Sequence, residues 1–264
     1  MSDQVPVFQV EHVSKAFGGV QALRDVQFAI YPGEVHALLG ENGAGKSTLI
    51  KIMTGVHQPD SGALLLDGAP VHFANTRAAQ EHGIAAIYQE PSLFPDLDVA
   101  ENILIGRQPM RGGRVDWKRL YQEAGAVLKR LGLSLNPRTR ARDLSVAQQQ
   151  IVEIARALSI NARVLIMDEP TSSLTLAEVE DLFTIVRQLR AGGTAIVFIS
   201  HRLEELFALA DRVTTLRDGA YVGTQPLASV TTDGLIRMMV GRSLAELFPK
   251  QAVAQGGDAV GQGK

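Results

Sequence analysis

Residues 35–48 read VHALLGENGAGKST, a short and mostly apolar stretch followed by a glycine-rich segment that ends in a lysine and two hydroxyl residues. The apolar stretch predicts a strand, and the polar residues after it predict a tight turn and the start of a helix. Glycines at 40, 43 and 45 let backbone N–H groups turn inward, and a helix beginning near Lys46 points its positive end at the same place. The segment therefore predicts a loop that cradles phosphate groups.

The stretch from 40 to 48 satisfies the P-loop pattern in full. Lys46 can reach the β- and γ-phosphates of a nucleotide, and the Ser47 hydroxyl can ligate Mg²⁺. An ordinary glycine-rich turn would explain the glycines, but not the strand before them and the helix after them. We expect these residues to contact the nucleotide: Gly40, Glu41, Asn42, Gly43, Ala44, Gly45, Lys46, Ser47 and Thr48.

Two adjacent carboxylates follow a second apolar stretch, residues 164–167 (VLIM). A P-loop enzyme needs a carboxylate on another strand to hold the metal, and Asp168 fits that role. Glu169 can then orient the attacking water or accept its proton. The alternative is an acidic pair that caps a helix before Pro170, which leaves two acids at an apolar strand end without a role.

The apolar pattern along the chain predicts an α/β fold. Two continuous apolar runs, 164–167 and 195–199, suit strands buried on both faces of a parallel sheet, with a helix at about 177–189 between them. Other strand patterns lie within 5–35, 63–73 and 84–88, and other helix patterns lie at 99–105, 116–131 and 147–159.

Composition excludes several classes of function. The 264 residues contain no cysteine, so disulfides, zinc–thiolate sites and thiol catalysis are impossible. The net charge is −2, without the basic excess of a strong nucleic-acid binder. No run of about 18 apolar residues and no secretion signal is present, so we expect any membrane role to depend on a partner.

Further segments in a fixed order narrow the family. Residues 144–150 read LSVAQQQ and precede a helix, Gln89 follows the strand at 84–88, and His201 follows the strand at 195–199. With these segments the sequence resembles the ABC ATPases over about residues 7–248. The resemblance implies a P-loop NTPase core with a mainly parallel sheet, an antiparallel β subdomain and an inserted α-helical subdomain.

The resemblance also implies a domain organisation. The ABC ATPase domain is expected over residues 5–248, with the helical subdomain inserted at about 92–160. Residues 249–264 are rich in glycine, alanine and glutamine, and we expect them to form a disordered tail or a linker.

Roles for individual residues follow from the same resemblance. The expected catalytic set is Lys46, Gln89, Glu169 and His201, and the expected metal set is Ser47, Gln89 and Asp168. Phe17 matches the aromatic residue that stacks on adenine. In this family two nucleotide domains enclose two ATP molecules head to tail, so that the signature of one domain faces the P-loop of the other. The signature residues expected at the nucleotide are Ser145, Ala147 and Gln148.

Two departures from the family pattern affect the shared site. The usual signature is Leu-Ser-Gly-Gly-Gln, but this chain has Val146 and Ala147 in place of both glycines, and Thr175 stands where the D-loop usually ends in Asp. If either glycine needs a positive φ or a bare backbone, the change weakens the site; if the segment is helical, it costs little. We therefore hypothesise a slower or asymmetric site.

Within the family the sequence is most similar to ATPases of bacterial monosaccharide importers of the ribose, galactose, xylose and rhamnose type. The similar stretches are 148–158, 166–175, 199–205 and 238–242. The resemblance implies ATP and Mg²⁺ as cofactors, and sugar uptake powered at the cytoplasmic face of the inner membrane. The implied partners are transmembrane permease subunits, a second ATPase domain and, indirectly, a periplasmic sugar-binding protein.

Two alternatives remain beside sugar import. One is an ABC-type ATPase that acts on nucleic acid or the ribosome. The absence of heptads between Gln89 and Leu144 and of a basic excess argues for no nucleic-acid partner. The other is a regulatory ATPase with weak or no turnover, which the complete set of phosphate and metal residues disfavours.

Overall fold

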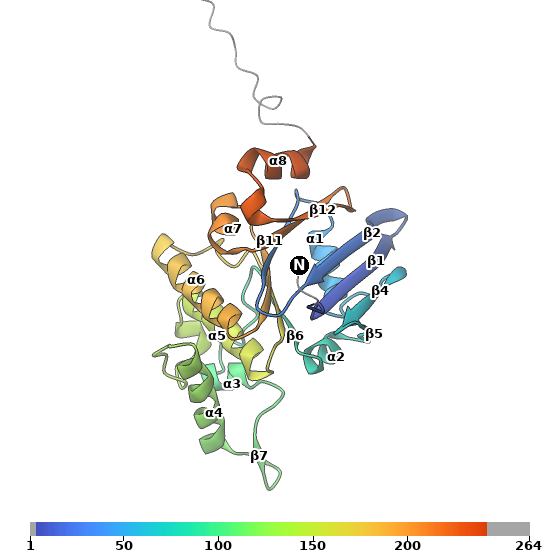
Figure 1. The fold of residues 1–264 in the computed structure, drawn as a ribbon. Helices are drawn as coiled ribbons and strands as arrows, with labels where there is room; N and C mark the ends of the chain where they lie inside the picture. Colours follow the sequence, from blue (N-terminus) through green and yellow to red (C-terminus); the bar gives the residue numbers. More distant parts are fainter. Residues whose placement is uncertain (1–3, 242–264) are drawn as a thin grey trace, which may run out of the picture.

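The computed structural model describes residues 4–241, and its centre is one mixed ten-stranded sheet (Figure 1). The strands follow one another in space in the order β5-β4-β1-β2-β12-β11-β3-β10-β9-β6. Their bounds are Phe8–Phe17 (β1), Val20–Ile30 (β2), Val35–Leu39 (β3), Ser61–Leu66 (β4), Ala69–Val71 (β5), Ile84–Ile87 (β6), Val164–Asp168 (β9), Ala195–Ile199 (β10), Arg212–Arg217 (β11) and Ala220–Pro226 (β12). A separate hairpin pairs Met110–Arg111 (β7) with Arg114–Val115 (β8).

Helices cover the sheet and form a lobe at one end (Figure 1). Their bounds are Lys46–Met53 (α1), Thr76–Glu81 (α2), Val99–Ile103 (α3), Trp117–Arg130 (α4), Val146–Ser159 (α5), Leu176–Ala191 (α6), Leu203–Leu209 (α7) and Thr232–Val240 (α8). None of the helices within residues 4–241 is both long and apolar enough to span a membrane.

The parallel part of the sheet is buried on both faces. Strands β11, β3, β10, β9 and β6 run parallel to one another, and successive side chains alternate between two hydrophobic cores. In β10, Ile196 and Phe198 enter one core, whereas Val197 and Ile199 enter the other. Side chains on neighbouring strand positions point to opposite faces, so the continuous apolar run at 195–199 follows directly from this double burial.

The antiparallel subdomain forms the opposite end of the sheet. Strand β1 pairs with β2 and β4, and β4 pairs with β5, all antiparallel. The predicted fold class is therefore confirmed: a mainly parallel core sheet, an antiparallel β subdomain and helices inserted between β6 and β9.

The inserted lobe contains α3, α4 and α5, at the positions where the sequence predicts helices. Sequence patterns did not predict the β7–β8 hairpin, because strands of two residues are too short to show an alternating pattern. The domain boundary at 248 and the tail at 249–264 lie outside the described residues.

Asn102 fastens the chain that enters the inserted lobe. Its side chain is fully buried, accepts a hydrogen bond from the Phe94 amide at 2.8 Å, and donates to the carbonyls of Phe94 (3.0 Å) and Asp98 (3.0 Å). These bonds satisfy backbone groups of a loop that has no strand or helix of its own. The loop between β6 and α3 is thus held against the first helix of the lobe.

Replacing Asn102 with Ala should lower the free energy of unfolding by about 1–3 kcal/mol, because the buried amide and carbonyls of the loop lose their partner. Urea denaturation followed by circular dichroism measures the change. Glu180→Ala, an exposed change on α6, is the control and should shift stability far less. Equal effects of the two substitutions would contradict a fastening role for Asn102.

Candidate functional site

The glycine-rich loop lies between the end of β3 and the start of α1. Gly40, Gly43 and Gly45 have φ of 158°, 84° and 99°. A Cβ on Gly40 would collide with the carbonyl oxygen of Leu216, and one on Gly45 would lie 2.8 Å from the Ala22 carbonyl oxygen. Glycine is therefore required at 40 and 45 by close backbone approach as well as by φ. Helix α1 has no side chain capping its first turn, which leaves N–H groups of the loop and helix for an anion.

Lys46 is the first residue of α1 and folds over the loop. Its Nζ donates to the carbonyl oxygens of Gly40 at 2.6 Å and Glu41 at 3.0 Å. Burial lowers the pKa of Lys46, and the carboxylates of Glu169 and Asp168 oppose that shift. The ammonium thus lies between the loop and the two acids, where it can neutralise phosphate charge.

The two acids lie at the end of β9: Asp168 is its last residue and Glu169 follows it. Burial raises the pKa of Asp168, the neighbouring Glu169 raises it further, and Lys46 opposes the shift. Glu169 adopts φ 49° and donates its amide to the Ile199 carbonyl at 3.0 Å. A positive φ is uncommon for a residue with a side chain, and such strain persists where surrounding structure imposes it. Here the strand geometry ends at Glu169, while Asp168 stays in the ladder opposite Ile199.

His201 follows β10, the strand beside β9. Its Nδ1 lies 3.3 Å from Oε2 of Glu169. Ile199 pairs with Asp168 in the parallel ladder, so the two strands end at the same edge of the sheet. A histidine at this distance can orient the carboxylate of Glu169 or share a proton with it.

Two adjoining hollows collect these residues. Both hollows are lined by Asn42, Lys46 and Glu169. One also contains Gly43, Gly45, Ser47, Thr48, Gln89 and Asp168. The other also contains Gly40, Glu41, Ser200, His201 and Met239. The structure therefore gathers the predicted catalytic and metal sets at one place, with Ala44 buried within the loop itself.

Ser47, Gln89 and Asp168 offer a hydroxyl, an amide and one carboxylate to the same hollow. That set of oxygen donors fits Mg²⁺, which in phosphate-binding enzymes is held by one or two carboxylates together with water and phosphate oxygens. Within residues 4–241 there is no cluster of three or more His, Cys, Asp or Glu side chains that could cage a metal without the nucleotide.

Phe17 ends β1 and remains 42% exposed, outside the lining of both hollows. The edge of its ring meets His57, with ring centroids 5.1 Å apart, and Lys15 Nζ lies 5.4 Å from its centroid. His57 is anchored to the C-terminal end of α1, because its amide donates to the Lys51 carbonyl. Sequence analysis missed His57, since a histidine after a helix carries no recognisable pattern. Phe17 thus presents an exposed ring on a support tied to the P-loop helix.

The signature residues lie apart from both hollows. Ser145 caps α5: its Oγ accepts from the Gln148 amide at 3.3 Å, and the Gln148 side chain accepts from the Ser145 amide at 3.0 Å. Val146 and Ala147 form the first turn of α5 and have no positive φ. The segment is therefore helical and does not need a positive φ at either position, so its backbone does not require glycine at 146 or 147.

Thr175 likewise caps a helix. Its Oγ1 accepts from the Glu178 amide at 3.4 Å, and the Glu178 carboxylate accepts from the Thr175 amide at 2.9 Å. Threonine and aspartate are both good N-cap residues, so the departure from the family pattern preserves α6.

A buried carboxylate joins the loops that carry Glu169 and His201, and sequence analysis missed it. Glu205 on α7 accepts hydrogen bonds from Thr171 Oγ1 at 2.8 Å and from Ser200 Oγ at 2.6 Å. Thr171 follows Glu169 in the loop after β9, and Ser200 precedes His201. Glu205 is therefore a positioning residue that holds the loops of Glu169 and His201 together.

Comparison of the sequence with known proteins identifies its relatives. The sequence profile of the ABC transporter family matches residues 23–172. A ribose import ATP-binding protein, RbsA 1 of Streptomyces coelicolor, is 60% identical over 252 residues, which cover 95% of this chain and 50% of the relative. The chain spans about half the length of the curated relatives it matches.

Solved structures agree with the fold. The ADP conformation of MJ1267, an ATP-binding cassette of an ABC transporter, superposes with a TM-score of 0.76 at 26% identity and covers 93% of this chain and 99% of that one. A dimeric post-hydrolysis state of the cassette MJ0796 bound to ADP and Pi superposes with a TM-score of 0.70 at 25% identity, covering 83% and 98%.

Replacing Glu205 with Gln should lower the free energy of unfolding by about 1–3 kcal/mol, because two buried hydroxyl donors lose a charged acceptor. Urea denaturation measures the loss. Glu204→Gln, the same change at the exposed neighbour, is the matched control and should be nearly neutral. The positioning role is wrong if both variants unfold at the same urea concentration.

Proposed function

Because the chain belongs to the ABC transporter family, we propose that it binds and hydrolyses Mg-ATP to drive transport through partner subunits. The observation that carries this proposal is the convergence of Lys46, Asp168, Glu169 and His201 on two adjoining hollows at the carboxyl edge of the sheet.

The residues divide the chemistry among themselves. The glycine loop and the α1 amides bind the phosphates, and Lys46 neutralises their charge. Glu169 orients the attacking water and receives its proton, with His201 steadying the carboxylate at 3.3 Å. Ser47, Gln89 and Asp168 would hold Mg²⁺ together with the nucleotide, and the ion would supply charge neutralisation at the phosphates. The raised pKa of Asp168 is consistent with a site built for a cation, because a nearby positive charge restores the ionised form.

A second nucleotide domain completes the site in this proposal. The signature residues Ser145, Ala147 and Gln148 lie outside the hollow of their own chain, as a head-to-tail arrangement requires. The dimeric solved cassette supports this arrangement. The second domain is another copy, a separate subunit or a fused half, since the relatives are about twice as long as the matched region.

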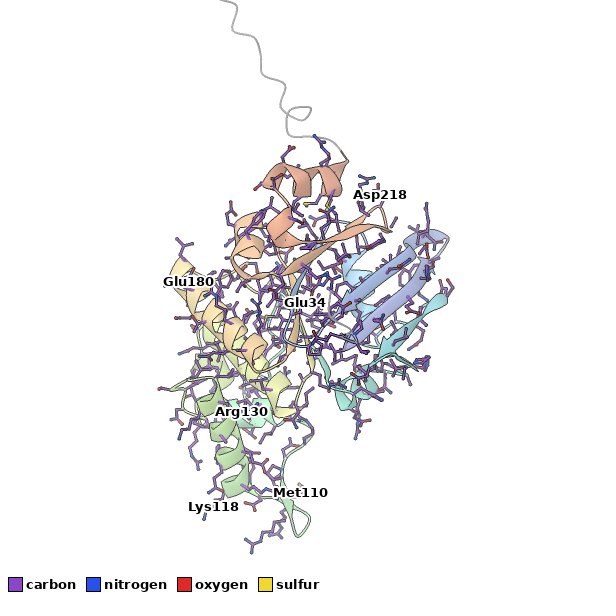
Figure 2. The ribbon with its side chains drawn as sticks, in the orientation of Figure 1. Glu34, Met110, Lys118, Arg130, Glu180 and Asp218 are labelled. Atoms are coloured by element: carbon purple, nitrogen blue, oxygen red, sulfur yellow. The ribbon has the colours of Figure 1, made fainter. Side chains whose placement is uncertain are left out.

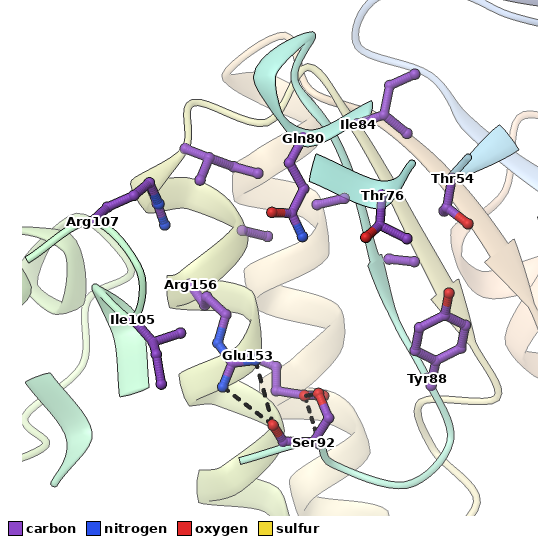
Figure 3. A pocket seen from close by; sticks show the side chains of 14 residues that line it. Thr54, Thr76, Gln80, Ile84, Tyr88, Ser92, Ile105, Arg107, Glu153 and Arg156 are labelled. Carbon is purple, nitrogen blue, oxygen red and sulfur yellow. Dashed lines mark hydrogen bonds between the residues drawn. The ribbon is translucent and has the colours of Figure 1, made fainter. Parts of the chain in front are cut away.

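A groove between α2, β6 and the inserted lobe supports a permease partner (Figure 3). Arg107 and Arg156 line it beside Glu153, whose Oε1 accepts from the Ser92 amide and hydroxyl at 2.8 Å. The other carboxylate oxygen, Oε2, is buried without a hydrogen-bond partner among the described residues. Such an atom needs a donor, which a docked segment of a membrane subunit can bring.

The groove and the phosphate site share a strand end. Tyr88 lines the groove, and the next residue, Gln89, lines the nucleotide hollow. A partner seated in the groove therefore acts on a residue bonded directly to one at the metal site. In the loop after Ser92, which lines the groove, Phe94 is 53% exposed, whereas Leu93 packs on the core.

The proposed cargo is a monosaccharide, and the proposed direction is import. Similarity to proteins named for ribose import supports both. In this proposal the chain works peripherally at the cytoplasmic face of the inner membrane, with a periplasmic sugar-binding protein delivering the cargo to the permease. Nothing in the described residues favours the nucleic-acid or regulatory alternatives.

Glu169→Gln should reduce ATP turnover by about 10²–10⁴-fold while ATP binding persists, because the carboxylate that accepts the proton is gone. Phosphate release measures turnover, and size-exclusion chromatography with ATP tests for a trapped dimer. Lys46→Ala is the comparison: it should lose binding itself. Wild-type turnover in Glu169→Gln would exclude Glu169 as the base.

Restoring glycine at both Val146 and Ala147 should raise turnover if the side chains crowd the facing nucleotide. The same change should lower the free energy of unfolding by about 1 kcal/mol or more, because glycine is a poorer helix former than alanine. Steady-state ATPase assays and urea denaturation give the two quantities. A loss of stability without a gain in turnover would count against a weakened signature.

A further inference from the structure

The far end of the inserted lobe is a narrow tip, which we define as residues 110–119. It consists of the β7–β8 hairpin and the first turn of α4. Gly112 and Gly113, with φ of 57° and 77°, form the turn of the hairpin. Met110 and Lys118 lie at the extreme lower end of the molecule, away from the sheet (Figure 2).

Two large apolar side chains remain exposed on the tip. Met110 is 58% exposed and Trp117 is 50% exposed. Trp117 stacks against Tyr121, with ring centroids 6.3 Å apart. Tyr121 is itself fixed, because its hydroxyl donates to Asp98 at 2.7 Å and the guanidinium of Arg138 lies 3.7 Å from its ring centroid. Trp117 is therefore held outward on a rigid support instead of folding into the core.

The tip also carries unneutralised positive charge. Its cations are Arg111, Arg114, Lys118 and Arg119, against the single acid Asp116. Arg119 is paired with Glu123 at 2.7 Å, and Asp116 caps α4. Within residues 4–241, Arg111, Arg114 and Lys118 form no ion pair.

The shape, charge and exposed apolar side chains of the tip together favour a lipid surface as its partner. An exposed tryptophan beside lysine and arginine suits the boundary between lipid headgroups and acyl chains. Anionic phospholipids attract clustered cations near the membrane surface. A protruding tip can enter a headgroup layer.

We propose that the tip binds the anionic phospholipid surface, with Trp117 and Met110 in the headgroup layer and Arg111, Arg114 and Lys118 on the phosphates. The proposal adds a direct lipid contact to the proposed attachment through a permease, and it rests on the membrane-bound state of the proposed function. In this proposal, the charge of the lipids affects how strongly the chain binds to the membrane surface.

Trp117 is the only tryptophan of the chain, so intrinsic fluorescence reports on the tip directly. The purified chain is mixed with vesicles of phosphatidylglycerol and phosphatidylcholine, or of phosphatidylcholine alone. We expect a blue shift with the anionic vesicles only, quenching by brominated acyl chains, and loss of the shift at high salt. An unchanged spectrum with anionic vesicles, or equal shifts with both vesicle types, overturns the proposal.

The charge contribution is tested by replacing Arg111, Arg114 and Lys118 together with Gln. Co-sedimentation with anionic vesicles should weaken at least tenfold, whereas the same replacement of the exposed Arg24, Lys129 and Arg130 should have little effect. Equal loss in both variants, or binding of the tip to an acidic peptide or nucleic acid in place of vesicles, contradicts a lipid site.

Failure of this proposal can be told apart from failure of the proposed function. ATP turnover is measured without vesicles, and the tip variant should keep the wild-type rate because its residues lie outside the nucleotide hollows. A wild-type chain that hydrolyses ATP but does not bind anionic vesicles contradicts the lipid proposal alone, whereas one that binds anionic vesicles without hydrolysing ATP contradicts the proposed function alone.

Discussion

The parallel pairing of β10 with β3 on one side and β9 on the other is the constraint on which the site depends. Both faces of these strands are packed in hydrophobic cores, so their carboxyl ends are where polar side chains can meet a ligand. The glycine loop leaves β3, Asp168 ends β9 with Glu169 directly after it, and His201 follows β10. Shared register then places groups that are more than a hundred residues apart around one hollow.

Buried hydrogen bonds stabilise the carboxyl edge of the sheet, where the backbone of Glu169 is strained. Glu169 holds a positive φ, which a residue with a side chain adopts only when its surroundings impose it. Its amide is tied to Ile199, and Glu205 joins Thr171 to Ser200 just beyond. The loops after β9 and β10 are thus bonded to each other, so movement of one is transmitted to the other by direct contact.

The inserted lobe carries two surface features, a groove next to this edge of the sheet and an exposed tip at its far end. Its groove lies beside β6. Of the two residues that follow this strand, Tyr88 lines the groove and Gln89 lines the nucleotide hollow. Its tip carries exposed Trp117 on a support of Tyr121, Asp98 and Arg138. Asp98 also caps α3, so the support of the tip and the first helix of the lobe share a residue.

The sequence alone determined the phosphate loop, the paired acids and the α/β alternation, because each depends on neighbours in the chain: glycine φ, helix N-terminal amides and apolar periodicity. It could not assign Glu205 its bond to Thr171, Met239 its place at the hollow or His57 its contact with Phe17, since each depends on a segment distant in the chain. The outcome of the altered signature also waited for the fold, where Val146 and Ala147 proved helical. The register of β9 and β10 and the exposure of Trp117 were decided only by packing between distant segments, which no local pattern encodes.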